Sequence, residues 1–190
     1  MGCGGGPARV EQPGYNPQAG ADALAAYDAN NDGVIADEEF DSAPALRAAL
    51  GQIDMDGDER LTATEIDARV QEWQRTKIAE MPVRCEVTLD GQALPGASVV
   101  FEPEPFLGTN LHSAIGTTAP SGTGGITLAK EHLADPKYAG VACGWYKIRV
   151  THSDREIPAR YNTETTLGCE VAMNAHWVNH GAVLLELKSL

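Results

Sequence analysis

The twelve residues Asp28-Ala29-Asn30-Asn31-Asp32-Gly33-Val34-Ile35-Ala36-Asp37-Glu38-Glu39 carry oxygen donors at regular intervals. Side chains supply them at positions 1, 3, 5 and 12 of the stretch, from Asp28, Asn30, Asp32 and Glu39. Position 7 contributes the backbone carbonyl of Val34, and a water beside Ala36 would serve position 9. Calcium takes six to eight oxygen ligands at this spacing, and Gly33 stands at position 6, where such a loop turns sharply. The stretch therefore predicts a calcium-binding loop.

A second stretch of twelve, Asp54-Met55-Asp56-Gly57-Asp58-Glu59-Arg60-Leu61-Thr62-Ala63-Thr64-Glu65, starts 26 residues later (54 − 28 = 26). Its expected donors are Asp54, Asp56, Asp58, the Arg60 carbonyl, Thr62 and Glu65. Glu59 stands where glycine is usual, and a positive φ at a non-glycine residue costs about 1 kcal/mol. Ile35 and Leu61 share position 8 and are expected to pair between the stretches. Both stretches resemble EF-hand loops, which implies two Ca²⁺ ions per chain.

Apolar residues recur at helical spacing before each stretch. Leu24 and Tyr27 predict a helix over 21–27 that enters the first loop. Pro44 suits the first turn of a second helix, for which Ser42 is the expected cap. The two helices and two loops together predict a paired, all-α EF-hand segment over residues 19–81.

A third helix is expected to leave the second loop. Thr62 and Glu65 form a capping-box pattern at its start, and Trp73 lies on its apolar face, where we expect core packing. Its interior contains neither glycine nor proline up to about Glu80, and Pro82 would end it. We therefore expect a continuous helical strut that holds the two halves of the chain in one orientation.

The net charge of −13 is concentrated in the first half of the 190-residue chain. Residues 1–80 hold 16 acidic and 6 basic side chains, whereas residues 81–190 hold 11 and 8. Nucleic-acid binding is not expected on this balance, because phosphate contacts need a basic surface. No stretch is long and apolar enough to predict a membrane span.

After residue 82 the hydrophobic period changes from helical to alternating. Seven short alternating stretches predict strands around 83–89, 99–101, 115, 126–128, 146–150, 167–173 and 183–187. Asp90-Gly91 is a turn signal, and the segment 129–138 is expected to hold one helical turn. This pattern is typical of an all-β antiparallel sandwich.

Two segments of this half resemble a known family. Val-Thr-Leu-Asp-Gly-Gln-Ala-Leu-Pro-Gly-Ala-Ser-Val-Val-Phe over 87–101 resembles the opening of carboxypeptidase regulatory-like domains, and Gly-Trp-Tyr-Lys-Ile-Arg-Val over 144–150 is similar to a later strand of that family. These domains are transthyretin-like (prealbumin-like) sandwiches of bacterial cell-envelope proteins, including those of planctomycetes. The resemblance implies a non-catalytic binding or spacer domain over 82–190, with a protein or envelope partner.

The glycine-rich beginning of the chain resembles the end of a bacterial lipobox. Gly2-Cys3 is followed by three glycines, which implies a lipid on Cys3 and an envelope address; the alternative is a cytosolic glycine-rich tail. Residues 1–18 are expected to form a flexible tether. Cys85 and Cys169 fall on the inward side of their predicted strands, and could be bridged or be buried thiols.

Two further interpretations remain beside the envelope calcium protein. His176 and His180 are four residues apart, as zinc ligands on a helix can be, which would suit a metal-dependent enzyme, although Asn174 and Gly181 indicate a loop. The other interpretation is a dockerin-like module that docks a scaffold protein, although the predicted helix over 21–27 is unusual for such a module. We expect no enzymatic activity, with calcium stabilising the first domain and its removal leaving the second nearly unchanged.

Overall fold

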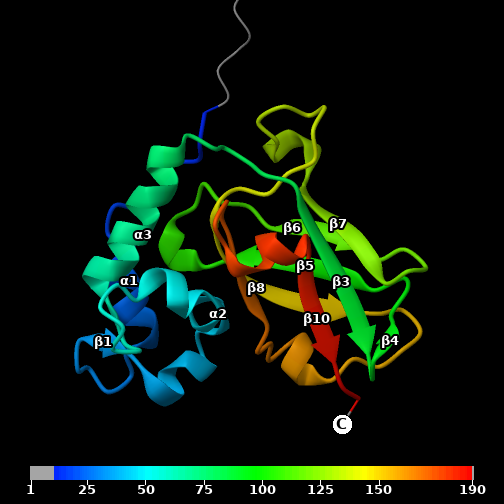
Figure 1. The fold of residues 1–190 in the computed structure, drawn as a ribbon, viewed down its shortest axis with the longest axis horizontal. Coiled ribbons are helices and arrows are strands. Elements are labelled where there is room, and N and C mark those ends of the chain that lie inside the picture. The colour runs from blue at the N-terminus through cyan, green and yellow to red at the C-terminus, as the bar shows by residue number, and fades with distance from the viewer. Residues whose placement is uncertain (1–10, 190) are drawn as a thin grey trace, which may run out of the picture.

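The computed structural model describes residues 11–189, so the predicted lipid site at Cys3 lies outside the described residues. Three α-helices, α1 (Ala19–Tyr27), α2 (Pro44–Ile53) and α3 (Ala63–Thr76), lie together beside a large curled sheet (Figure 1). A 3₁₀ helix, η1 (Asp37–Asp41), separates α1 from α2. None of the described helices has the length and apolar character needed to cross a membrane.

The helix boundaries follow local sequence signals, with two differences from expectation. Thr62 and Glu65 form the predicted capping box of α3, and Pro44 opens α2. Ser42 does not cap α2, because the N-cap position falls on Ala43, which makes no side-chain cap hydrogen bond. The predicted strut to Glu80 is wrong, since α3 ends at Thr76, where Lys77 takes a left-handed conformation with φ of 61°.

The second half forms the expected β-rich structure. Its strands are β3 (Val83–Leu89), β4 (Gln92–Ala93), β5 (Ser98–Pro103), β6 (Ala114–Thr117), β7 (Thr123–Leu128), β8 (Gly144–Thr151), β9 (Gly168–Val171) and β10 (Val183–Leu187). The hydrogen-bonded order is β10-β3-β7-β6-β5-β8-β9, and β4 pairs with β3. All seven predicted strands are present, and the short β4 is an addition. The predicted helical turn is the 3₁₀ helix η3 (Lys130–His132).

Pairing is antiparallel except at one edge. β10 runs parallel to β3, with Val183 opposite Cys85 and Leu187 opposite Leu89 (Figure 1). The chain leaves β9 at one end of the strand order, passes through the 3₁₀ helix η5 (His176–His180), and returns to the other end. The two edge strands β9 and β10 both contribute to the wall of one hollow of about 230 Å³. The fully antiparallel pairing predicted from the sequence is therefore corrected at β10.

The two halves share one hydrophobic core. Trp73 of α3 meets Trp145 of β8 edge to face, with ring centroids 4.4 Å apart, and both rings are buried. Helix residues such as Ile53 and Ile66 belong to the same buried cluster as Phe101 of β5. The predicted boundary at residue 82 therefore falls inside a continuous packed region.

A buried ion pair reinforces this junction. Arg69 of α3 donates to both carboxylate oxygens of Glu170 on β9, at 2.6 and 2.9 Å, and the two side chains are only 3% and 2% exposed. Trp73 Nε1 donates to the same carboxylate at 3.0 Å. Burial alone would lower the pKa of Arg69, but the hydrogen bonds and charge of Glu170 outweigh it and raise that pKa. The charged pair is fully partnered, as a buried pair must be.

Residues 11–18, which the sequence places in a flexible tether, contact the body of the protein. Tyr15 is buried, and its hydroxyl donates to the carbonyl of Cys143 at 2.9 Å. The amide of Gln12 donates to the carbonyls of Trp73 and Ile78, at 2.9 and 2.8 Å, at the end of α3. This segment thus covers the junction between α3 and the sheet.

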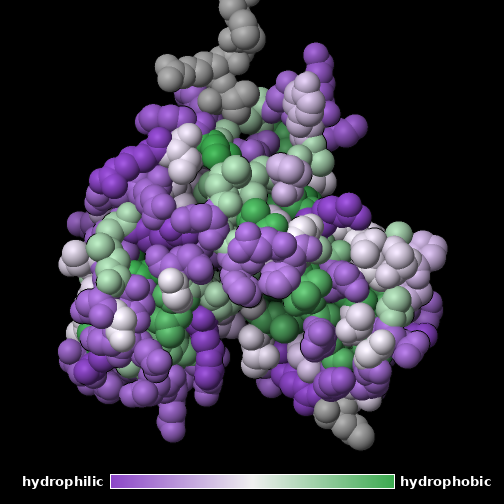
Figure 2. Space-filling view, in the orientation of Figure 1, coloured by the Kyte–Doolittle hydropathy of each residue, from purple (hydrophilic) through white to green (hydrophobic). Residues whose placement is uncertain are grey.

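Figure 2 shows a largely hydrophilic surface over the helical part and hydrophobic residues gathered near the middle of this face, where β3 and β10 run. The exposed apolar side chains include Leu184 of β10. The acidic character read from the sequence of the first half therefore corresponds to a polar, solvated surface around the two loops.

Candidate metal centre

The two predicted loops lie side by side. β1 (Val34–Ile35) and β2 (Leu61–Thr62) form a two-stranded antiparallel sheet in which Ile35 stands opposite Leu61. Both of these side chains are fully buried. The predicted pairing of the position-8 residues is therefore confirmed, and it gives the loops a common apolar floor.

The first loop is folded around its own backbone. Asp28 accepts hydrogen bonds from the N–H groups of Asp32 and Gly33, at 3.1 and 2.9 Å. Glu39 reaches back to the N–H groups of Ala29 and Ala36, at 2.8 and 3.0 Å. Gly33 has the positive φ expected at position 6, 90°, which glycine adopts without steric cost. The carboxylates of Asp28 and Glu39 thus both accept hydrogen bonds from the backbone of this loop.

The second loop repeats this arrangement. Asp54 accepts from the N–H groups of Gly57 and Glu59, at 2.7 and 2.9 Å. Glu65 accepts from the N–H groups of Met55 and Thr62, both at 2.9 Å, and so closes the loop on itself. Glu59 has a φ of 61°, so the non-glycine residue does occupy the left-handed region. The expected backbone strain at position 6 is present.

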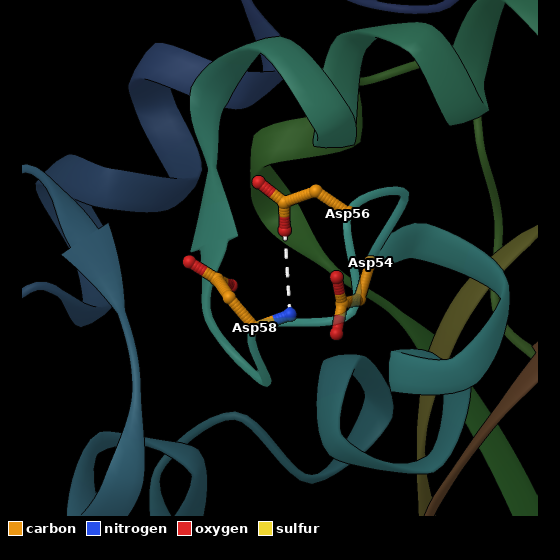
Figure 3. A group of neighbouring side chains, drawn as sticks. All are labelled: Asp54, Asp56 and Asp58. Carbon is orange, nitrogen blue, oxygen red and sulfur yellow. Dashed lines mark hydrogen bonds between the residues drawn. The ribbon is translucent and has the colours of Figure 1, made fainter.

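Three aspartates of the second loop come together. One carboxylate oxygen from each of Asp54, Asp56 and Asp58 lies within 4.8 Å of the others. Figure 3 shows these side chains around the turn between α2 and β2, with the N–H of Asp58 donating to Asp56 at 3.3 Å. Within residues 11–189 no other group of three or more His, Cys, Asp or Glu side chains is so close. The structure therefore gathers these three predicted ligands of the second loop more tightly than the carboxylates of the first.

Charge crowding is visible in the ionisation of this cluster. Desolvation, followed by the charges of Asp58, Glu65 and Asp54, raises the pKa of Asp56, although its side chain is exposed. Desolvation would also raise the pKa of Asp54, but hydrogen bonds from backbone N–H groups, foremost that of Glu59, outweigh it and lower this pKa. The carboxylates of this cluster repel one another, and backbone N–H groups keep Asp54 ionised. A bound cation would relieve that repulsion.

The donor set suits one class of metal. Carboxylate, amide and carbonyl oxygens are hard ligands, which favour Ca²⁺ or Mg²⁺ over Zn²⁺ or copper. The remaining predicted donors lie in the same two loops. Val34 and Thr62 belong to the paired strands β1 and β2, Arg60 directly precedes β2, and Asn30 lies in the first loop before β1. The residues present fit calcium in type and order.

The sequence did not reveal what the side chain of Arg60 does. Only its carbonyl entered the predicted ligand set, yet its guanidinium donates to Asp32 Oδ2 of the first loop at 2.9 Å. The antiparallel pairing of β1 with β2 brings the two residues together although they are 28 positions apart. The spacing of ligands within one loop carries no signal of such a contact between loops.

The histidine pair does not gather further ligands. His176 and His180 lie on the exposed 3₁₀ helix η5, where a loop was expected, with ring centroids 5.2 Å apart. They stand at the 230 Å³ hollow between β9 and β10, but form no three-ligand group within the described part of the chain.

Three of the four cysteines lie within the described residues. Cys85, Cys143 and Cys169 are all free and buried, so of the two alternatives for Cys85 and Cys169 the structure has buried thiols. Burial raises the pKa of Cys85 and of Cys143 to about 11. These groups stay protonated near neutral pH and are poor nucleophiles.

Comparisons with protein-family models, with curated proteins and with solved structures find no match to this chain. The likenesses to EF-hand loops and to carboxypeptidase regulatory-like domains therefore rest on the residues quoted for them.

Proposed function

We propose that this protein is a non-catalytic calcium-binding protein of EF-hand type. The observation that carries the proposal is the Ile35–Leu61 pairing, which joins two twelve-residue loops that share oxygen donors at positions 1, 3, 5, 7 and 12. The close carboxylates of Asp54, Asp56 and Asp58 support it independently of the sequence pattern. The expected side-chain ligands are Asp28, Asn30, Asp32 and Glu39 in the first loop, and Asp54, Asp56, Asp58 and Glu65 in the second.

Calcium in this proposal stabilises the fold. Ten acidic side chains lie in the two loops, five in each, and their repulsion opposes folding without a cation. The expected affinity is modest, with a Kd of about 10⁻⁴–10⁻³ M as in extracellular modules. Two features weaken it, because Glu59 is strained at its positive φ and Ala36 offers no side-chain oxygen.

The β-rich half is proposed to be a transthyretin-like binding or spacer module that faces a protein or envelope partner. With a lipid on Cys3, the chain would be tethered to a bacterial cell envelope. The dockerin-like alternative predicts instead that the loops dock a scaffold protein. The helix α1, which leads directly into the first loop, favours the EF-hand interpretation.

Isothermal calorimetry with matched variants tests the proposal. Wild type should bind two Ca²⁺ ions, and Glu39→Gln and Glu65→Gln should each lose one, because each removes a loop's closing carboxylate. Glu38→Gln and Glu59→Gln remove the same charge from non-ligand positions of the same loops and should keep both sites. No heat of binding below 10 mM calcium, or equal losses in the ligand and control variants, would contradict it.

A further inference from the structure

The two loops are joined by an ion pair as well as by a strand pair. Arg60 Nη2 lies 2.9 Å from Asp32 Oδ2, and the two side chains are 47% and 39% exposed. The other oxygen of Asp32 accepts from the N–H of Val34 at 3.2 Å. Both oxygens of this predicted calcium ligand are therefore engaged within the protein.

Arg60 has a unique position among the charges of the two loops. The first loop contains no lysine or arginine, and Arg60 is the sole basic residue of the second. Its neighbour Leu61 pairs with Ile35, so β-pairing directs the residue toward the first loop. Its backbone carbonyl belongs to the ligand set of one loop, while its guanidinium contacts a ligand of the other.

We propose that Arg60 sets the calcium affinity of the first loop by acting as an internal cation that competes for Asp32. This inference rests on the proposed calcium function and deepens it. A guanidinium beside Asp32 offsets negative charge while no metal is bound, and opposes a second cation at the same carboxylate.

Arg60 is expected to have opposite effects on the stability of the metal-free protein and on its calcium affinity. Arg60 stabilises the metal-free protein, because it relieves repulsion in a loop with three predicted carboxylate ligands. It also lowers the affinity of that loop, since calcium has to displace the guanidinium or share Asp32 with it. The second loop has four predicted carboxylate ligands, and no arginine within residues 11–189 forms an ion pair with any of them, so it then fills first.

Nuclear magnetic resonance on the full chain separates the two loops without disabling either. The amide of Gly33 reports on the first loop and that of Gly57 on the second, during titration with CaCl₂. In Arg60→Gln the midpoint for Gly33 should fall by about threefold to tenfold, the range expected for removing one half-exposed competing charge. The midpoint for Gly57 should change by less than about twofold.

Arg47→Gln is the matched control. Arg47 lines the same surface hollow as Arg60, but its guanidinium pairs with Asp41, which is outside both ligand sets. It removes the same charge and should move the Gly33 midpoint by less than about twofold. Arg60→Lys keeps the charge and should retain most of the weakening.

Melting temperatures provide a second readout. In excess chelator Arg60→Gln should melt below wild type, and saturating calcium should narrow that gap. The inference is overturned if the Gly33 midpoint of Arg60→Gln is unchanged or higher, or falls equally in Arg47→Gln. Failure of the underlying calcium function would look different, because neither glycine would shift even in wild type.

Discussion

Glu104 directly follows β5, and its carboxyl is almost completely buried. Tyr27, which directly precedes the first predicted ligand, donates its hydroxyl to Glu104 Oε2 at 2.6 Å. The other oxygen, Oε1, has no hydrogen-bond partner in the described part of the chain, and neither has the buried Trp145 Nε1. Burial raises the pKa of Glu104, although Tyr27 and the charge of Lys147 oppose the increase.

The free energy of unfolding should therefore depend on pH through Glu104. With a raised folded-state pKa, the folded protein holds a proton that the unfolded chain has already lost. This residue's contribution to stability is thus full below about pH 4.5, the usual value, and falls as the pH rises through the raised pKa. Glu104→Gln removes this loss of stability and keeps an oxygen that can accept from Tyr27. The free energy of unfolding of the variant should therefore increase relative to that of wild type as the pH rises.

Urea denaturation in excess chelator, from pH 4 to pH 8, measures the difference in free energy of unfolding between Glu104→Gln and wild type. Glu102→Gln on β5 is the control, because it removes a carboxylate whose exposed pair with Arg149 is screened by solvent. It should run parallel to wild type. A constant offset between Glu104→Gln and wild type across the whole range would refute the prediction.

Among the elements, α2 and β9 approach each other more closely than side chains allow. A Cβ placed on Gly168 of β9 would lie 2.4 Å from the backbone nitrogen of Ala45 and 2.4 Å from the carbonyl carbon of Pro44. The start of α2 therefore rests directly on the edge strand. This contact is made by backbone atoms, which cannot move aside like the end of a flexible side chain.

Gly168→Ala should consequently destabilise the protein by about 1–3 kcal/mol, the usual range for an overpacked contact. Gly125→Ala on β7 is the matched control, since a Cβ there meets nothing within 4 Å, and it should be close to neutral. Chemical denaturation of both variants checks the prediction. Equal stability of the two would show that α2 and β9 separate without cost.

Local patterns predicted most of the elements. Alternation was sufficient for strands such as β3 and β8, and loop spacing was sufficient for the Ile35–Leu61 pair and the positive φ of Gly33. These features depend on residues close in sequence, or on a period that a buried face imposes. Three of the predicted ligands, Asp54, Asp56 and Asp58, are also brought together.

What the sequence did not predict depends on contacts between distant residues. The direction of β10 beside β3 is one case, because alternation is the same in parallel and antiparallel strands. The Arg69–Glu170 pair spans 101 positions, and the Arg60–Asp32 pair links two loops. The early end of α3 has another cause, since Lys77 takes a conformation usually left to glycine.

On the scale of the whole molecule, the helical and β-rich halves are built around the same core. Glu65 closes the second loop and caps α3, and one turn later Arg69 of that helix binds Glu170 on β9. Removing either partner of such a buried pair costs about 3–5 kcal/mol. Loss of order in the loops is therefore expected to affect the sheet, unlike the separate response that the sequence suggested.

We accordingly predict one cooperative unfolding transition. Calcium at 100 times its Kd stabilises the folded state by about 2.7 kcal/mol per site, so excess chelator should lower a single melting temperature for the whole protein. Differential scanning calorimetry, with circular dichroism for the helices and the sheet, measures this. Two transitions, of which only one responds to calcium, would instead support independent domains.

The placement of the tryptophans gives the junction an optical signal of its own. Two of the three indoles lie where α3 meets the sheet, with Trp73 edge-on to Trp145, and the third, Trp177, donates from Nε1 to the carbonyl of Glu170 on β9 at 2.7 Å. Neither of the two predicted calcium-binding loops contains a tryptophan. Intrinsic fluorescence therefore reports on the junction between the two halves. The close pair Trp73–Trp145 should also produce an exciton couplet in circular dichroism, which disappears when α3 separates from the sheet.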